Sequence, residues 1–229
     1  RNSGKMQLRI ALALAMLGSE SGAQTIYDEI DNQLQSSLPE LKEHIEHSGA
    51  KYRTPPDQGA APICANLIYA LGMTRSDLNV FAIELVSELF KAESIDDFKL
   101  KNKALFFYID AVCYAASKVG SKSVIPYLKK IHANPFLNNR SIKRGIEKDH
   151  VLERLSLMEL ILGRALARSG SDKGYQILIE YLDDMRAVLA EFAHDTLVKI
   201  TNNDFGKDKR EWSNWLVMNM SNLKPEKTN

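Results

Sequence analysis

Apolar residues recur every three to four positions along most of the chain, which is the spacing of one face of an amphipathic helix. Alternating apolar and polar runs stay short, and the hairpin dipeptides Asn-Gly and Asp-Gly are missing. The pattern predicts an all-α protein of about ten helices. To within about two to four residues at each end, we expect helices near 5–18, 22–35, 38–48, 62–72, 77–91, 99–119, 122–132, 151–169, 172–183 and 186–201, and a terminal helix near 208–220.

Three segments repeat one pattern when they are aligned on a glycine, at Gly18, Gly120 and Gly170. In each segment an alanine-rich apolar helix precedes the glycine, a serine follows it, and a second amphipathic helix comes next. A weaker copy surrounds Gly72. The aligned positions are Ala13, Ala115 and Ala165, then Ala15, Ser117 and Ala167, and finally Ile26, Leu128 and Leu178.

The residues of this repeat have identifiable physical roles. Glycine ends a helix at low cost because it readily adopts the left-handed conformation. The serine that follows can cap the next helix by accepting a backbone N–H. Neither helix of a pair can bury its apolar stripe alone, so we expect the pairs to stack on one another.

The repeats resemble HEAT-like repeats of the lyase type, which combine an arginine, spaced alanines and a Leu-Gly turn. Arg9, Ala15, Leu17 and Gly18 fit this pattern in LRIALALAMLG. The resemblance implies a right-handed α-α superhelix, a HEAT- or armadillo-like solenoid of about four to five helix pairs. We expect one domain over 1–229, with repeats near 5–35, 62–91, 99–132, 151–183 and 186–220, and interruptions near 36–61 and 133–150.

The same resemblance assigns roles to residues near the C-terminal end. In such repeats an aspartate and an arginine commonly tie neighbouring repeats together, which implies a structural role for Asp183 and Arg186 in YLDDMRAVLAEFA. The tail ITNNDFGKDKREWSNWL resembles the closing segment of such domains. We favour an end cap, in which Trp212 and Trp215 cover the last pair, over an aromatic platform for a ligand.

The first stretch of the chain imitates a secretory signal, with a basic start, an apolar run from Ile10 to Leu17 and small residues before Gln24. We favour a repeat helix, because the same pattern recurs downstream, where no signal can lie. No apolar run reaches the roughly 18 residues of a membrane-spanning helix. We therefore expect no membrane partner.

One link between repeats, HANPFLNNRSIKRGIEKDH, holds Arg140, Lys143, Arg144 and Lys148. Loops carried on a rigid scaffold often hold function. One interpretation is a partner-binding site for an anion or an acidic protein. The other is a solvated connector, since surface charge is common.

The remaining composition argues against several kinds of chemistry. The net charge of +1 disfavours nucleic acid. Cys64 and Cys113 lie in apolar runs and are expected to be buried free thiols. His44 and His47 have a spacing that suits two metal ligands, but a third ligand is missing and a polar helix end is the interpretation we favour. No dinucleotide, Walker or nucleophile-elbow motif occurs, so we expect no cofactor, no metal and no catalytic residues.

Three functions stay open. We favour a non-catalytic protein-interaction or scaffolding solenoid, part of a longer bacterial protein, that binds another protein or another domain of the same polypeptide. Tyr127 and Tyr175, on second helices of their pairs, would line its concave surface. The alternatives are an accessory domain of a flavin-dependent oxidoreductase, which 104–206 resembles, and a helical-repeat enzyme such as a DNA-base glycosylase or a pigment lyase.

Overall fold

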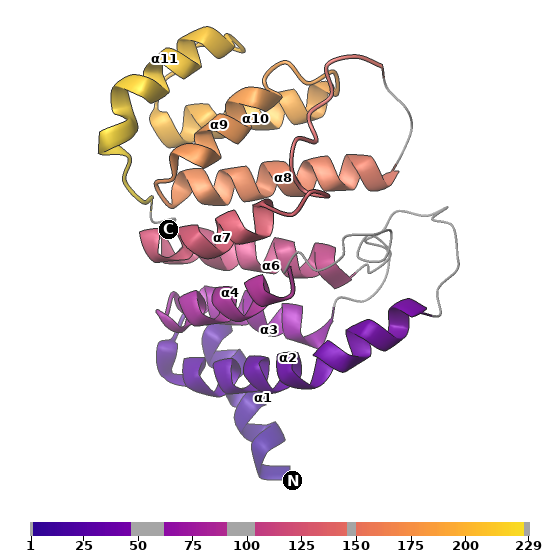
Figure 1. The fold of residues 1–229 in the computed structure, drawn as a ribbon. Helices are drawn as coiled ribbons and strands as arrows, with labels where there is room; N and C mark the ends of the chain where they lie inside the picture. Colours follow the sequence, from indigo (N-terminus) through magenta and orange to yellow (C-terminus); the bar gives the residue numbers. More distant parts are fainter. Residues whose placement is uncertain (1, 47–61, 91–103, 146–149, 227–229) are drawn as a thin grey trace. The chain divides into compact units, whose positions relative to one another are not determined.

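The structure is a computed structural model that describes residues 2–46, 62–90, 104–145 and 150–226. Within these ranges the chain forms helices and loops and contains no strand, so the predicted all-α class is confirmed. The chain divides into two compact units (Figure 1), Arg1–Val119, here called unit 1, and Gly120–Thr228, here called unit 2.

Each unit is built from helices that follow one another along the chain. Unit 1 contains α1 (Asn2–Met16), the 3-10 turn η1 (Glu20–Gly22), α2 (Ala23–Glu46), α3 (Ile63–Thr74), α4 (Leu78–Glu88) and α6 (Ala104–Val119). Unit 2 contains η2 (Lys122–Val124), α7 (Ile125–His132), α8 (His150–Arg168), α9 (Asp172–Tyr181), α10 (Ala187–Thr201), α11 (Lys209–Asn219) and η3 (Met220–Asn222).

The break that the sequence predicts near residue 36 is wrong. Helix α2 continues without interruption from Ala23 to Glu46, so the helix expected at 38–48 is the second half of α2. Strong helix formers such as Gln, Leu, Glu and Lys dominate this stretch, and their summed propensity outweighs the single Pro39. The rest of the predicted interruption, 47–61, lies outside the described residues.

The three aligned glycines share one backbone conformation at the ends of α1, α6 and α8. Gly18, Gly120 and Gly170 have φ angles of 76°, 54° and 84°. After α1 and after α8 the glycine N–H bonds to the carbonyl three residues back and the next serine N–H bonds to the carbonyl five residues back, at 2.8–3.0 Å. This pair of bonds is a Schellman motif, which ends a helix by satisfying its last carbonyls.

The serines after these glycines differ in what they bind. The hydroxyls of Ser19 and Ser121 accept the backbone N–H two residues on, at 3.3 Å and 3.2 Å. Ser171 makes no side-chain capping bond at the start of α9. Its buried hydroxyl has no hydrogen-bond partner among the described residues. The capping predicted for the serines therefore occurs in two of the three copies.

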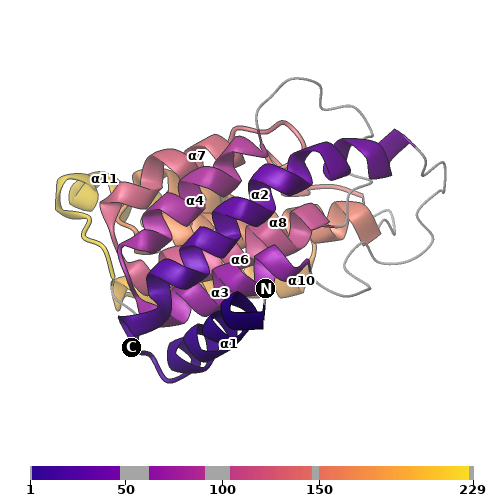
Figure 2. The ribbon, with the colours of Figure 1, turned by 90° about the horizontal axis from the view of Figure 1, so that it is seen from below.

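Within each unit the helices pack in two layers. In unit 1, α3 lies between α1 and α6, while α2 contacts α1, α3 and α4; Figure 2 shows α1 and α3 on one side of α2. In unit 2, α8 packs against α7, α9 and α10, and α9 also contacts α10 and α11. The aligned residues Ile26, Leu128 and Leu178 are each 0% exposed, so the second helix of each copy buries the same position.

Helices α8 and α9 approach so closely that only glycine fits at their contact. A Cβ on Gly174 would lie 2.1 Å from the nitrogen of Ala167 and 2.5 Å from the oxygen of Gly163. Real Cβ atoms never come this near to backbone atoms, so any side chain there would push the helices apart. The small residues of the repeat therefore set the spacing of this pair.

Helix α11 closes unit 2. Asp208 caps it by accepting the N–H groups of Arg210 and Glu211 at 2.8 Å and 3.2 Å. Trp212 is 0% exposed and donates its indole N–H to the carbonyl of Gly206 at 2.8 Å. Trp215 is half-buried.

Candidate functional site

The candidate site of unit 2 is formed by α8, α9 and the residues 133–145 that follow α7, here called the connector. The carboxylate of Glu159, in the middle of α8, holds this segment by its backbone. One oxygen accepts the N–H of Asn139 at 2.9 Å, and the other accepts the N–H of Arg140 at 2.7 Å. Asn139 has a φ of 58°, a left-handed conformation that asparagine tolerates better than most residues. The backbone turns at this point.

Two side chains complete the surroundings of Glu159. The Nε2 atom of His132 lies 3.1 Å from one carboxylate oxygen, and the hydroxyl of Tyr181 donates to the other at 2.7 Å. The side chains of His132 and Glu159 are only 5% and 4% exposed. Burial alone would raise the pKa of Glu159, but the hydrogen bonds from His132, Tyr181 and the Arg140 N–H hold this pKa below its ordinary value. Burial and the adjacent Glu159 charge raise the pKa of Tyr181.

A second anchor holds the next residues of the connector. The guanidinium of Arg186 and the hydroxyl of Ser156 both donate to the carbonyl of Arg140, at 2.9 Å and 3.0 Å. The N–H of Ile142 donates to Asp184 at 2.8 Å, and the carbonyl of Ile142 accepts the N–H of residue 185 at 2.9 Å. Helix α8 and the segment between α9 and α10 thus both bind the backbone of residues 140–142.

The ion pair in this second anchor is almost fully buried. An Arg186 nitrogen lies 2.7 Å from an Asp184 oxygen, and the two side chains are 10% and 0% exposed. Burial opposes the charge of Asp184, but Arg186 and two backbone N–H groups keep its pKa below the ordinary value. The carboxylate partner of Arg186 is therefore Asp184 and not Asp183, one residue away. Asp183 is exposed and pairs instead with Lys143 and Lys209.

Residues 139–142 are held in the way that a domain holds a bound peptide. Five of their backbone groups, the N–H groups of 139, 140 and 142 and the carbonyls of 140 and 142, are bonded to α8 or to the segment between α9 and α10. Backbone contacts of this kind recognise an extended chain without demanding particular side chains.

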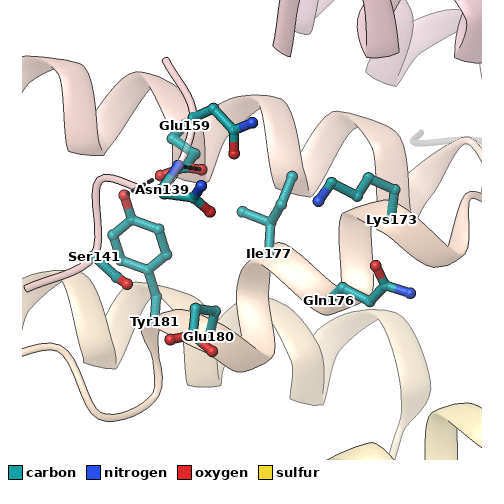
Figure 3. A pocket seen from close by; sticks show the side chains of 9 residues that line it. Asn139, Ser141, Glu159, Lys173, Gln176, Ile177, Glu180 and Tyr181 are labelled. Atoms are coloured by element: carbon teal, nitrogen blue, oxygen red, sulfur yellow. Dashed lines mark hydrogen bonds between the residues drawn. The ribbon is translucent and has the colours of Figure 1, made fainter. Parts of the chain in front are cut away.

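A pocket with a volume of about 230 Å³ opens between the connector and α9. Figure 3 shows Asn139 and Ser141 on the connector side, and Lys173 extending along the pocket toward Ile177. The lining residues are Asn138, Asn139, Ser141, Glu159, Lys173, Gln176, Ile177, Glu180 and Tyr181. The lining combines amide groups, a hydroxyl and one apolar side chain, which suits a polar, extended ligand.

The charged groups of the pocket differ in whether they have ion-pair or hydrogen-bond partners. Glu180 forms ion pairs with Lys143 at 2.9 Å and with Lys209 at 2.8 Å. Glu159 is saturated by its four donors. Lys173 makes no hydrogen bond or ion pair with any described residue. The groups still free to bind a ligand are therefore the amides, the Ser141 hydroxyl and the Lys173 ammonium.

The basic residues predicted to bind a partner separate in the structure. Arg140 donates to the carbonyl of Pro135, and Lys143 is occupied by Glu180 and Asp183. Arg144 is exposed. Lys148 lies outside the described residues. The Arg140 side chain thus bonds within the connector, Lys143 ties the connector to Glu180 of α9 and to Asp183, and Lys143 and Arg144 are both exposed.

The two tyrosines predicted to line a binding surface also differ. Tyr127, on α7, is half-buried. Tyr175, on α9, is 3% exposed, and its ring centroid lies 5.6 Å from that of Trp215. Burial raises the pKa of Tyr175 to about 12. The Tyr175 ring is therefore buried where α9 contacts α11.

Sequence reasoning missed the residues that organise the site: His132, Ser156, Glu159, Tyr181 and Asp184. Glu159 lies within the apolar run LSLMELILG. The only available signal was a single glutamate inside an apolar helix. The sequence also contains histidines and tyrosines, but it does not show which of them lie near this glutamate. Buried carboxylates require partners, so this glutamate could have been marked as paired, although its partners could not have been named.

No group of three His, Cys, Asp or Glu side chains suited to a metal occurs in the part of the chain that the structure describes. No helix among the described residues is long and apolar enough to cross a membrane. His44 lies on the part of α2 whose side chains are not described, and His47 lies outside the described residues.

Comparisons with known proteins add no family assignment. No protein-family model matches the chain, and no curated protein or solved structure matches it significantly.

Proposed function

We propose that the chain is a protein-interaction domain, a HEAT-like superhelix of stacked helix pairs that binds an extended segment of a partner protein. In unit 2 the partner segment lies in the pocket between the connector and α9. The partner is either another protein or another domain of the same polypeptide.

The repeat supports the architecture in this proposal. The glycines that end α1, α6 and α8 all have positive φ angles, and the second helices bury the same aligned position. Inside each unit, helices pack on their neighbours along the chain. A stack of this kind creates an elongated surface along its second helices, which repeat proteins use to bind partners.

The observation that carries the proposed function is the way unit 2 holds residues 139–142. Glu159, Asp184, Arg186 and Ser156 bind this segment through its backbone groups. Unit 2 therefore already binds a short run of polypeptide through its backbone groups, which supports the proposal that it binds a second one. The adjoining pocket continues that surface and offers amide groups, which can both donate to and accept from a second backbone.

Selection of a random-peptide display library against the full-length chain tests this function. We expect selected peptides to bind with micromolar affinity and to shift the backbone NMR signals of residues around Lys173 and Gln176. Replacing either the half-buried Lys173 or the exposed Gln176, in Lys173→Ala or Gln176→Ala, is expected to weaken binding by about tenfold. Lys199→Ala, an exposed lysine on α10 outside the pocket, is the matched control.

Two results would contradict the proposed function. One is that no peptide binds more tightly than about 1 mM, the range of non-specific contacts. The other is that selected peptides bind Lys173→Ala, Gln176→Ala and the control variant equally well.

A further inference from the structure

Helix α1 carries apolar side chains on two opposite faces. On the inner face, Ala11 and Ala15 are 3% and 0% exposed. On the outer face, Met6 and Ile10 are 58% and 54% exposed, and Leu17, the first residue after α1, is 83% exposed. At 100° per residue these three side chains and the exposed Ala13 fall within one narrow arc. This arc, defined by the four residues, is called the outer face of α1.

The repeat shows that such positions are normally covered. Aligned on their glycines, the outer-face residues of α1 correspond to four positions in α6 and four in α8. All eight of these equivalents are at most 8% exposed: Tyr108, Val112, Ala115 and Val119 in α6, and Met158, Leu162, Ala165 and Ser169 in α8. The residue pattern of α1 thus matches that of helices that are covered on both faces, yet one face of α1 is exposed to solvent.

The position of α1 within unit 1 explains the open face. Helix α3, in the same layer, has α1 on one side and α6 on the other. Helix α1 contacts η1, α2 and α3, and Figure 1 shows it at the margin of unit 1. Apolar patches of this kind mark interaction sites in folded proteins. The shape that fits is another helix, because α3, in the same layer, has a helix on each side, α1 and α6.

Charge indicates what kind of helix fits. Lys5 and Arg9 are exposed and border the outer face on one side, and no acidic residue precedes Glu20. A helix lying on this face would bring its own flank beside two positive charges. Carboxylates on that flank would be attracted, and basic residues would be repelled.

The same charges argue against two other occupants. A second copy of the chain that paired through its own α1 would place equal charges together. An anionic bilayer is attracted by clusters of basic residues, but after Lys5 and Arg9 no lysine or arginine occurs in the sequence before Lys42. Two charges suit the flank of one narrow helix with its own acidic residues.

We propose that the outer face of α1 binds an amphipathic helix of a partner protein, whose apolar stripe is bordered by Glu or Asp residues facing Lys5 and Arg9. The proposal rests on the chain being an interaction domain but uses no residue of the unit 2 pocket. Loss of one site therefore leaves the other measurable.

Two synthetic helical peptides of about 18 residues provide the test. Both carry one Leu/Ala stripe; one has Glu along its flank and the other has Lys at the same positions. Fluorescence anisotropy with the full-length chain is expected to show that the Glu peptide binds at least about tenfold more tightly. Ile10→Asp is expected to abolish binding of both peptides. The charge-swapped variant Lys5→Glu/Arg9→Glu is expected to reverse the preference between them.

Every substituted side chain is exposed, so circular dichroism should report an unchanged fold in each variant. Lys122→Glu, an exposed lysine in unit 2, is the matched control and should keep the original preference. The proposal is overturned if the two peptides bind equally, or if the charge swap leaves their order unchanged. It is also overturned if Ile10→Asp instead abolishes self-association in sedimentation, or binding to vesicles containing about 30% anionic lipid.

Discussion

Glu159 is the residue on which the position of the connector depends, because one carboxylate accepts four hydrogen bonds in a buried place. Glu159→Gln would turn one oxygen into an NH2 group that faces donors. We expect this variant to lose about 3 kcal/mol of unfolding free energy, the typical cost of disrupting a buried charged network. Urea unfolding followed by circular dichroism measures the loss. Glu211→Gln, an exposed control on α11, should change stability by less than about 0.5 kcal/mol; equal losses in the two variants would refute the role of Glu159.

The protonation of Glu159 gives a second prediction at this scale. Its pKa in the folded chain is lowered, so its carboxylate stabilises the fold fully above its unfolded-state pKa of about 4.3. That stabilisation is lost as the pH falls below this value and through the folded pKa. The stability difference between the native chain and Glu159→Gln should therefore shrink as the pH falls from 5 toward 3. Urea titrations across this range measure the difference. Asp184 is present in both proteins, so its own titration cancels, and a difference that grows at low pH would contradict the assignment.

The cysteines give a third prediction for single residues. Cys64 and Cys113 are free and buried, as their apolar surroundings in the sequence predict. Burial raises the pKa of the Cys64 thiol to about 11. Because the thiolate is the reactive form, we expect both thiols of the folded chain to react with Ellman's reagent at pH 8 on the order of a hundredfold more slowly than in urea. Absorbance at the reagent's product band follows the rate; a fast phase of one thiol in the folded chain would show that it is accessible.

Side-chain partners were the part of the site that the sequence could not supply. Arg186 illustrates the limit, since the resemblance implied a structural role for Asp183 and Arg186 but named no partner for either. The chain turns between α9 and α10, and this turn brings Asp184 to the guanidinium. A degenerate motif does not tell which of two adjacent aspartates is buried, and in the structure it is Asp184.

At the scale of helices, the contact between α8 and α9 depends on glycine. Gly174→Ala would force its Cβ onto backbone atoms of the partner helix, so we expect a loss of at least about 2 kcal/mol. Gly4→Ala in α1, where nothing lies within 4 Å of the new Cβ, should be neutral or stabilise by up to about 1 kcal/mol. Thermal unfolding of the two variants compares the effects. Equal melting temperatures would show that α8 and α9 have room to separate.

Helix ends were more predictable than helix lengths. Glycine conformations are local, so Gly18, Gly120 and Gly170 could be recognised as terminators from the sequence alone. The extent of α2 was missed because an interruption was expected near 36–61, where the repeat pattern lapses, whereas the residues up to Glu46 continue the helix. Propensity summed over a long window decided this case, and single residues did not.

At the scale of the whole molecule, the repeat and the division into two units predict different sources of stability. In a stack of repeats each helix is stabilised mainly by its neighbours. Unit 2 nevertheless contains its own core, with Met158, Leu162, Leu178, Leu197 and Trp212 all 0% exposed. Its helices α7 to α11 contact one another as a connected set. A unit with such a core has enough internal contacts to unfold in a single cooperative transition.

We therefore expect the fragment 120–229 to fold without unit 1. Its circular dichroism should be strongly helical, and its thermal unfolding should be a single cooperative transition, as for most domains of this size. The buried network supplies the internal check, because Glu159→Gln should destabilise the fragment by about the same 3 kcal/mol as it destabilises the full chain. A fragment that keeps helicity but unfolds without cooperativity would instead show that the core of unit 2 is completed only by the rest of the chain. In that case the connector and its pocket would be properties of the complete stack, and the peptide-binding site would have to be sought in the full-length protein alone.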